Sequence, residues 1–170
     1  MKPKSPSDST TMLARLMGIT DANNAGNVHG GTVMKLADET AGLAAIKHSG
    51  GRVVTAAMDR MAFLIPINVG DVVTFSATVN AAWRTSMEVG VKVEAENPRT
   101  GEVRHTNTAF LTMVALDEHG QPASVPPVLA RTADEVRRQR EAELRRANRL
   151  AERAEIIAHR EREDAAGAGS

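Results

Sequence analysis

Cysteine and tyrosine are absent from this 170-residue chain, and only three phenylalanines and one tryptophan supply aromatic rings. Without cysteine there can be no disulfide, no thiolate nucleophile, no cysteine-ligated zinc and no iron–sulfur cluster. The lack of disulfides fits a cytoplasmic protein. So few aromatic side chains cannot build the stacking platforms on which proteins bind single-stranded nucleic acid.

Net charge and long apolar runs are also missing. The 21 basic and 21 acidic residues cancel, so no overall field attracts nucleic acid or an anionic membrane. No apolar run reaches the length of a membrane span, and the N-terminus has no signal-peptide-like segment. The five histidines lack metal-ligand spacing, so we expect no metal. The hydrophobic fraction of 42% is enough for the core of one domain with tails.

Composition divides the chain into four segments. We expect a disordered polar tail over residues 1–11, a folded domain over 12–130, a charged helix over 131–163 and a disordered tail over 164–170. Thr132 and Glu135 form a capping box at the start of the charged helix. A sparse apolar stripe indicates that this helix docks on the domain or on a neighbouring subunit. Its balanced charge makes a nucleic-acid or partner site the less favoured interpretation.

The domain has the pattern of one strand, one long helix and then four strands. A short apolar segment, 12–19, precedes a polar glycine-rich loop at 21–31 and an apolar-faced helix at 32–48. Four later segments, 53–64, 72–83, 87–95 and 103–116, are rich in β-branched or alternating apolar residues. This order predicts an α+β fold with an antiparallel sheet wrapped on the helix. Uncovered sheet edges favour an oligomer.

Asp38 is the first candidate functional residue. It lies at the edge of the helix's apolar face, where a carboxylate is costly to place. Asp38 could instead cap a neighbouring loop or pair with an arginine. Gly30 and Gly31 stand at the start of the same helix, where unpaired amides and the helix dipole favour negative charge. No Lys-Ser/Thr pair follows them, so this is not a phosphate loop.

Several ordered motifs resemble those of the hotdog-fold acyl-CoA thioesterases of the YciA and brain acyl-CoA hydrolase type. They are Asp-Ala-Asn-x-Ala-Gly-Asn-Val-His-Gly-Gly from Asp21, Arg-Val-Val-Thr-Ala-Ala-Met-Asp from Arg52, Phe-x-x-Pro-Ile-x-Val-Gly-Asp from Phe63 and Arg-Thr-Ser-Met-Glu-Val from Arg84. The resemblance excludes both tails. It implies a hotdog fold, hydrolysis of an acyl-CoA to CoA and a carboxylate in fatty acid metabolism, and dimers with a continuous sheet that often form hexamers as trimers of dimers.

The resemblance also implies that Asn23 and Asp38 are catalytic, since relatives with two fused domains divide such an asparagine and aspartate between them. Asp38 would act as general base or attack directly, while Asn23 and the Gly30 and Gly31 amides polarise the thioester. Asp38 lies two helical turns, roughly 10 Å, beyond Gly31 and cannot reach a carbon held at its own helix N-terminus. We therefore predict a homodimer with composite sites, in which the loop and Asp38 come from different subunits.

Candidate contacts for CoA lie on two later segments. Arg84, Thr85 and Ser86 stand at a turn between strands, where a guanidinium and hydroxyls could meet phosphate. Arg60 is a weaker candidate for phosphate. Met58 belongs to the core or lines an adaptable acyl pocket, on the strand whose backbone the pantetheine arm would use. CoA is part of the substrate, so we expect no separate cofactor.

Two other functions stay open. A hotdog 3-hydroxyacyl-thioester dehydratase needs a histidine working with a carboxylate, and His29 with Asp38 is the pair that this chain offers. A non-enzymatic acyl-CoA-binding sensor or scaffold could use the C-terminal helix for a partner. Such a scaffold has no need of Asp38, so the substitution Asp38→Ala separates it from both enzymes.

Overall fold

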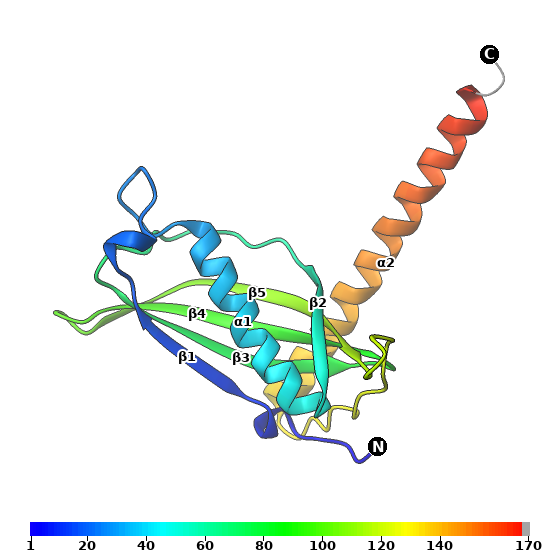
Figure 1. Cartoon of the computed structure of the whole chain (residues 1–170), viewed down its shortest axis with the longest axis horizontal. Helices are drawn as coiled ribbons and strands as arrows, with labels where there is room; N and C mark the ends of the chain where they lie inside the picture. The colour runs from blue at the N-terminus through cyan, green and yellow to red at the C-terminus, as the bar shows by residue number, and fades with distance from the viewer. Residues whose placement is uncertain (168–170) are drawn as a thin grey trace.

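The computed structural model describes residues 1–167 and is built on one antiparallel sheet that curls around a long helix (Figure 1). The elements are η1 (Pro6–Asp8), β1 (Thr11–Leu16), η2 (Ile19–Asp21), α1 (Gly30–Ser49), β2 (Arg52–Met58), β3 (Val72–Ala82), β4 (Ser86–Asn97), β5 (Glu102–Leu116) and α2 (Ala133–Gly167). The five strands lie in the order β1-β3-β4-β5-β2, so β1 and β2 form the two edges. The predicted α+β hotdog architecture, with a C-terminal helix, is confirmed.

Helix α1 packs on the inner face of the sheet through small and β-branched side chains. Its buried residues include four alanines, at positions 37, 41, 44 and 45, which let the helix backbone come close to the strands. On the sheet side, every second residue of β3 from Val73 to Val79 is fully buried, Phe75 among them. This alternation is the period-2 pattern of a strand with one face on the core. Packing in the core therefore determines which face of α1 points away from the sheet.

The edge strand β2 pairs with β5 and contains a bulge. Arg52 lies opposite Leu116 and Met58 opposite Leu111, with a register shift between Thr55 and Ala57. A bulge adds one residue to one strand and re-aims the side chains on either side of it. The other long edge of β2 has no strand beside it in the described chain.

The N-terminal segment is docked, which contradicts the predicted tail over residues 1–11. The Lys4 N–H donates to the Pro127 carbonyl at 3.0 Å, and the Lys4 carbonyl accepts from Leu129 N–H at 2.8 Å. The Lys4 ammonium donates to the carbonyls of Lys47 and His48 at 3.1 and 2.9 Å. A cation is favourable at the C-terminus of α1, where carbonyls lack helical partners. These long-range contacts order a segment that composition alone marks as disordered.

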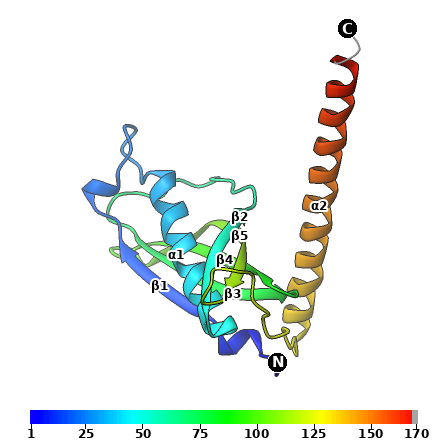
Figure 2. The same cartoon turned by 45° about the vertical axis from the view of Figure 1, so that its right-hand side comes forward.

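Helix α2 begins against the outer face of the sheet, opposite α1, and then projects past it (Figures 1 and 2). Ala142 is fully buried, whereas every residue from 151 to 157 is exposed. The helix was predicted to end at residue 163, but it continues to Gly167. Ala165 and Ala166 are strong helix formers, which accounts for the extension. The remaining residues of the predicted disordered tail, 168–170, lie outside the described part of the chain.

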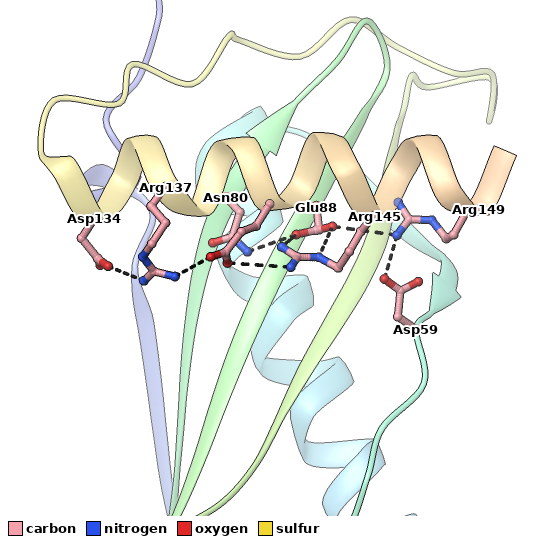
Figure 3. Close-up of polar contacts among 8 residues, drawn as sticks. Asp59, Asn80, Glu88, Asp134, Arg137, Arg145 and Arg149 are labelled. Carbon is pink, nitrogen blue, oxygen red and sulfur yellow. Dashed lines mark hydrogen bonds and ion pairs between the residues drawn. The ribbon is translucent and has the colours of Figure 1, made fainter. Parts of the chain in front are cut away.

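A network of ionic contacts anchors α2 to the sheet (Figure 3). The Glu88 carboxylate on β4 is fully buried and accepts hydrogen bonds from Arg145 at 2.6 and 3.1 Å and from the Asn80 amide at 3.2 Å. Arg149 lies 3.8 Å from Glu88 and donates to Asp59 at 2.7 Å. A buried carboxylate is tolerated only when it is paired in this way. Among residues 1–167, no helix is long and apolar enough to cross a membrane.

Candidate active site

The loop before α1 holds Asn23 through its side-chain oxygen. The Asn23 Oδ1 atom accepts hydrogen bonds from the N–H groups of Ala25 at 2.9 Å and Asn27 at 3.2 Å. Asparagine favours such turns because its short side chain can bond the backbone that follows it. With the oxygen fixed by two donors, the amide nitrogen Nδ2 is the group left to donate. Within residues 1–167 this nitrogen has no hydrogen-bond partner, so it is free for a ligand.

The first turn of α1 corrects one predicted donor. His29 is the N-cap, and its Nδ1 atom accepts the hydrogen bond of Gly31 N–H at 2.9 Å. The Gly31 amide is therefore occupied, because a capping side chain satisfies one of the unpaired donors of a helix start. A Cβ atom at Gly31 would lie 3.0 Å from His29 Nδ1, so the cap is closely fitted to glycine. The Gly30 N–H has no partner among the described residues and remains available.

Asn23 and Gly30 line one cavity at the N-terminus of α1. The cavity has a volume of about 260 Å³. Its other walls are mainly apolar and include Val28, Val33, Phe63, Ile65, Pro66 and Ile67. The Phe63 ring lies over the helix start, where a Cβ atom at Gly30 would be 3.4 Å from the ring. The structure thus brings two predicted site residues, each with a free donor, to one cavity that Asn27 and several apolar side chains also line.

Asp38 lies elsewhere, in the middle of α1. Its Oδ1 atom accepts a hydrogen bond from the Thr55 hydroxyl of β2 at 2.6 Å. Asp38 is half-buried and, in the described chain, has neither an arginine partner nor a loop to cap. Eight residues separate it from Gly30, which is about 12 Å along a helix axis. A single protomer therefore does not place Asp38 at the cavity that Asn23 and Gly30 share.

Thr55 is a residue that the sequence interpretation missed. The motif from Arg52 to Asp59 was recognised, but no role was given to its threonine. A hydroxyl that donates to a carboxylate fixes the orientation of that carboxylate and supports its charged form. The available signal was the place of Thr55 on a strand that must pass close to α1.

The predicted CoA contacts lie in two separate groups. Arg84, Thr85 and Ser86 form the turn between β3 and β4, whereas Met58 ends β2 and Arg60 follows it. Through β5, Ser86 is level with Val54, while Met58 is level with Leu111. Val114 and Leu111 are three residues apart along β5, which corresponds to about 10 Å. The Arg60 side chain is 96% exposed and lies 3.5 Å from Glu152 on α2, so it is not fixed toward the turn.

The histidine–carboxylate pair of a dehydratase does not form within the protomer. His29 uses Nδ1 as a helix cap, and nine residues of α1, about 13 Å, separate it from Asp38. The described protomer therefore gives that alternative no support.

Comparison with known proteins matches this geometry. A family model described as Thioesterase superfamily matches residues 25–102. The uncharacterized acyl-CoA thioester hydrolase YkhA of Bacillus subtilis (strain 168) is 41% identical over 116 residues, which are 68% of this chain and 67% of that protein. The crystal structure of an apo-hexameric acyl-CoA thioesterase is 40% identical, with a TM-score of 0.87, and covers 91% of this chain and 99% of its own.

A third relative allows the spacing of individual residues to be compared. The acyl-CoA hydrolase of Staphylococcus aureus, solved with butyryl-CoA and CoA, is 35% identical over 93% of this chain and 96% of its own, with a TM-score of 0.85. Structures also exist of variants in which an asparagine, an aspartate or a threonine of that enzyme is replaced by alanine. Those residues are 15 and 17 positions apart, the same intervals that separate Asn23, Asp38 and Thr55 here (38 − 23 = 15; 55 − 38 = 17).

Proposed function

The chain belongs to the thioesterase superfamily, and we propose that it is an acyl-CoA thioesterase, which hydrolyses an acyl-CoA to CoA and a free carboxylate. One observation carries the proposal. Two free donors, Asn23 Nδ2 and Gly30 N–H, line an apolar cavity at a helix N-terminus, and a carboxylate with a fixed orientation lies on the same helix. The asparagine, aspartate and threonine also share their spacing with the S. aureus hydrolase.

The donors stabilise the charge that develops on the thioester oxygen. When a nucleophile attacks the carbonyl carbon, its oxygen becomes an oxyanion, which Gly30 N–H and the Asn23 amide can bind. The N-terminal end of the α1 dipole adds a favourable field at this point. A single oxyanion donor of this type contributes about 3–4 kcal/mol to transition-state stabilisation. Asn23 keeps its place because two backbone N–H groups hold its oxygen.

Asp38 supplies the nucleophile in one of two ways. As general base it takes a proton from water, the hydroxide adds to the carbonyl carbon, and the C–S bond breaks to release CoA. As nucleophile it attacks the carbon itself and the C–S bond breaks, which releases CoA as thiolate and forms an anhydride. Water then hydrolyses the anhydride to the free carboxylate and restores Asp38. Thr55 binds Oδ1 and leaves Oδ2 for the water or the carbonyl carbon. Both routes need the carboxylate charged and held in one orientation.

The site is completed by a second copy of the chain. Because Asp38 and the Asn23–Gly30 cavity lie apart in one protomer, the loop of one subunit and Asp38 of its partner would form each site. The open edge of β2, beside Thr55, is where a second strand can pair. The apo-hexameric relative supports an assembly of three such dimers. A cysteine-free chain fits the cytoplasm, the compartment we propose.

The test is hydrolysis of an acyl-CoA series from acetyl to palmitoyl, followed by thiol release, for wild type and Asp38→Asn. We expect turnover of at least part of the series and its collapse in the variant, with CoA still bound. Glu39→Gln is the matched control. Glu39 lies on the exposed face of α1, where it pairs with Lys35, one helical turn before it, at 3.8 Å. No turnover of any acyl-CoA would overturn the proposed function. Equal turnover by Asp38→Asn would overturn the role of Asp38 only.

A further inference from the structure

Arg104 and Asp71 form a largely buried ion pair that the proposed reaction does not yet use. Arg104 Nη2 donates to Asp71 Oδ2 at 2.6 Å, and the two side chains are 21% and 4% exposed. Arg104 Nη1 donates to the Pro66 carbonyl at 3.3 Å. By strand register Arg104 is level with Ala95 and Val73, so it lies on the α1 side of the sheet. One side chain therefore ties together the two ends of the segment from Pro66 to Asp71.

Asp71 also holds the turn that precedes it. Its Oδ2 atom accepts a hydrogen bond from Asn68 N–H at 2.9 Å, and its own N–H donates to the Asn68 carbonyl at 3.1 Å. On the other side, Met17 N–H donates to the Asp71 carbonyl at 2.9 Å, and Gly70 N–H donates to the Met17 carbonyl at 2.8 Å. A buried polar network whose members bond one another is rigid, so the turn is held in one conformation.

This turn supports the loop that contains Asn23. Val28 N–H donates to the Ile67 carbonyl at 2.8 Å, and Asn27 forms an antiparallel bridge with Asn68. Asn27 in turn binds Asn23 twice, because its N–H donates to Asn23 Oδ1 at 3.2 Å and its carbonyl accepts Asn23 N–H at 2.7 Å. A continuous path of hydrogen bonds therefore leads from the ion pair to the Asn23 side chain.

The other donor of the candidate active site, Gly30 N–H, is supported by a different ion pair. Asp21 is buried and accepts a hydrogen bond from Arg15 at 2.7 Å. The Asp21 carbonyl accepts the N–H of His29, the N-cap of α1, at 2.7 Å. The helix start is thus fixed without Arg104, whose contacts lead to the half of the loop that ends at Asn23.

We infer that Arg104 is a positioning residue for hydrolysis, because it bridges Asp71 and Pro66 and so holds the Asn23 amide at the cavity. This role presupposes the proposed thioesterase function. Pro66 and Ile67 are themselves walls of that cavity, so a shift of the turn would move an apolar wall together with the donor. A misplacement of about 1 Å can lower a rate about 100-fold. Arginine suits the position because its planar guanidinium binds a carboxylate and a carbonyl at once in fixed geometry.

The test uses Arg104→Lys, which keeps a positive charge beside Asp71 but lacks the planar fork that also binds Pro66. We expect kcat for acyl-CoA to fall about tenfold or more, with KM within about threefold of wild type. Arg99→Lys is the matched control, because Arg99 is exposed in the turn between β4 and β5 and should keep wild-type kcat. A wild-type kcat in Arg104→Lys would overturn the inference and leave the proposed function intact.

A double-mutant cycle with Asn23→Ala separates positioning from a general loss of structure. If Arg104 acts through the Asn23 amide, Arg104→Lys should change kcat less than about twofold once that amide is gone. A general loss of structure would instead lower kcat by the same factor with and without Asn23. Equal factors in the two backgrounds would therefore overturn the inference.

Hydrogen exchange of backbone amides, followed by mass spectrometry, makes the result independent of turnover. We expect Arg104→Lys to exchange about tenfold faster than wild type over residues 23–28, with α1 and β4 unchanged, and Arg99→Lys to match wild type. Unchanged exchange over 23–28 in Arg104→Lys would overturn the inference. If wild type hydrolyses no acyl-CoA, the proposed function falls, and exchange alone then tests the hold of Arg104 on the loop. If Arg104→Lys does not fold, Asp71→Asn, which keeps an acceptor for Asn68 N–H, takes its place with the same expectations.

Discussion

At the scale of single residues, Thr55 acts on the reaction through one hydrogen bond to the Asp38 carboxylate. We expect Thr55→Val, which keeps the shape but removes the hydroxyl, to lower kcat about 10- to 100-fold, because a hydrogen bond to a charged group contributes about 1.5–3 kcal/mol. KM should change little. Thr55→Ser keeps a donor and should recover most of the rate. A valine variant with wild-type kcat would show that Asp38 does not depend on this contact.

A second residue-scale effect concerns stability at acidic pH. His48 is fully buried in the last turn of α1, and its Nε2 atom lies 2.9 Å from the Pro126 carbonyl. Burial is the main cause that lowers the pKa of His48 below its usual value, while the bond to Pro126 opposes the shift. Below the usual pKa, the unfolded chain therefore binds more protons than the folded chain. The contribution of His48 to the free energy of unfolding is present above about pH 6.5 and is lost as pH falls toward the lowered pKa.

Urea unfolding at pH 7.5 and pH 5.5 tests this effect. Wild type should lose stability on acidification, and His48→Gln, which cannot titrate, should lose less. The matched control is His119→Gln, because the His119 side chain is 78% exposed and should leave the pH dependence unchanged. An equal pH dependence in wild type and His48→Gln would assign the acid sensitivity to other groups.

At the scale of elements, the attachment of α2 depends on one buried ion pair. Arg145→Ala would leave the Glu88 carboxylate, which is fully buried, without its main partner. Breaking a buried pair from one side costs about 3–5 kcal/mol, whereas an exposed pair contributes about 0–1 kcal/mol. We therefore expect chemical denaturation to show a large loss of unfolding free energy for Arg145→Ala. The loss for Arg137→Ala should be small, since Arg137 pairs with exposed Asp134. Similar losses of unfolding free energy in both variants would mean that, in Arg145→Ala, α2 moves and water reaches the Glu88 carboxylate.

Much of the element pattern could be predicted because its signals are local. Apolar periodicity and turn residues placed α1 and four of the strands within three residues of their observed bounds. The strand predicted over 53–64 was too long, because β2 ends at Met58. The same alternation put Glu88 on the polar face of β4, which is correct, but it could not show that α2 covers that face. Lys4 likewise binds carbonyls more than 40 positions away, at Lys47 and His48. The burial of Glu88 and the docking of Lys4 both depend on contacts between distant segments, which cannot be predicted from composition.

The candidate site shows the same division. Loop and helix signals placed Asn23 beside Gly30, and the structure brings both to one cavity. Gly31 was assigned wrongly, because whether a cap takes an amide depends on the rotamer of His29. Thr55 was not assigned, because its contact with Asp38 requires the edge strand β2 to lie beside α1. The family resemblance predicted the chemistry, whereas the partners of each donor required the fold.

At the scale of the whole molecule, the protomer leaves three features open on one side. The edge of β2 has no neighbouring strand in the described chain, and α2 projects past it (Figure 2). Asp38 lies about 12 Å along α1 from Gly30, which lines the cavity. A symmetric dimer formed at this edge would address all three. Because a two-fold interface uses the same surface on both subunits, it would create two identical sites. Each would take Asp38 from one subunit and Asn23 from the other.

Subunit mixing tests this arrangement directly. Asn23→Ala and Asp38→Asn homodimers should both be nearly inactive. When the two variants are co-expressed with different tags, random pairing makes about half of the dimers mixed, and in a composite arrangement each mixed dimer has one site with both substitutions and one intact site. About a quarter of wild-type activity should then return. If each site were confined to one protomer, every site in the mixed dimer would carry a defect. Mixing would then restore nothing, whatever the oligomeric state.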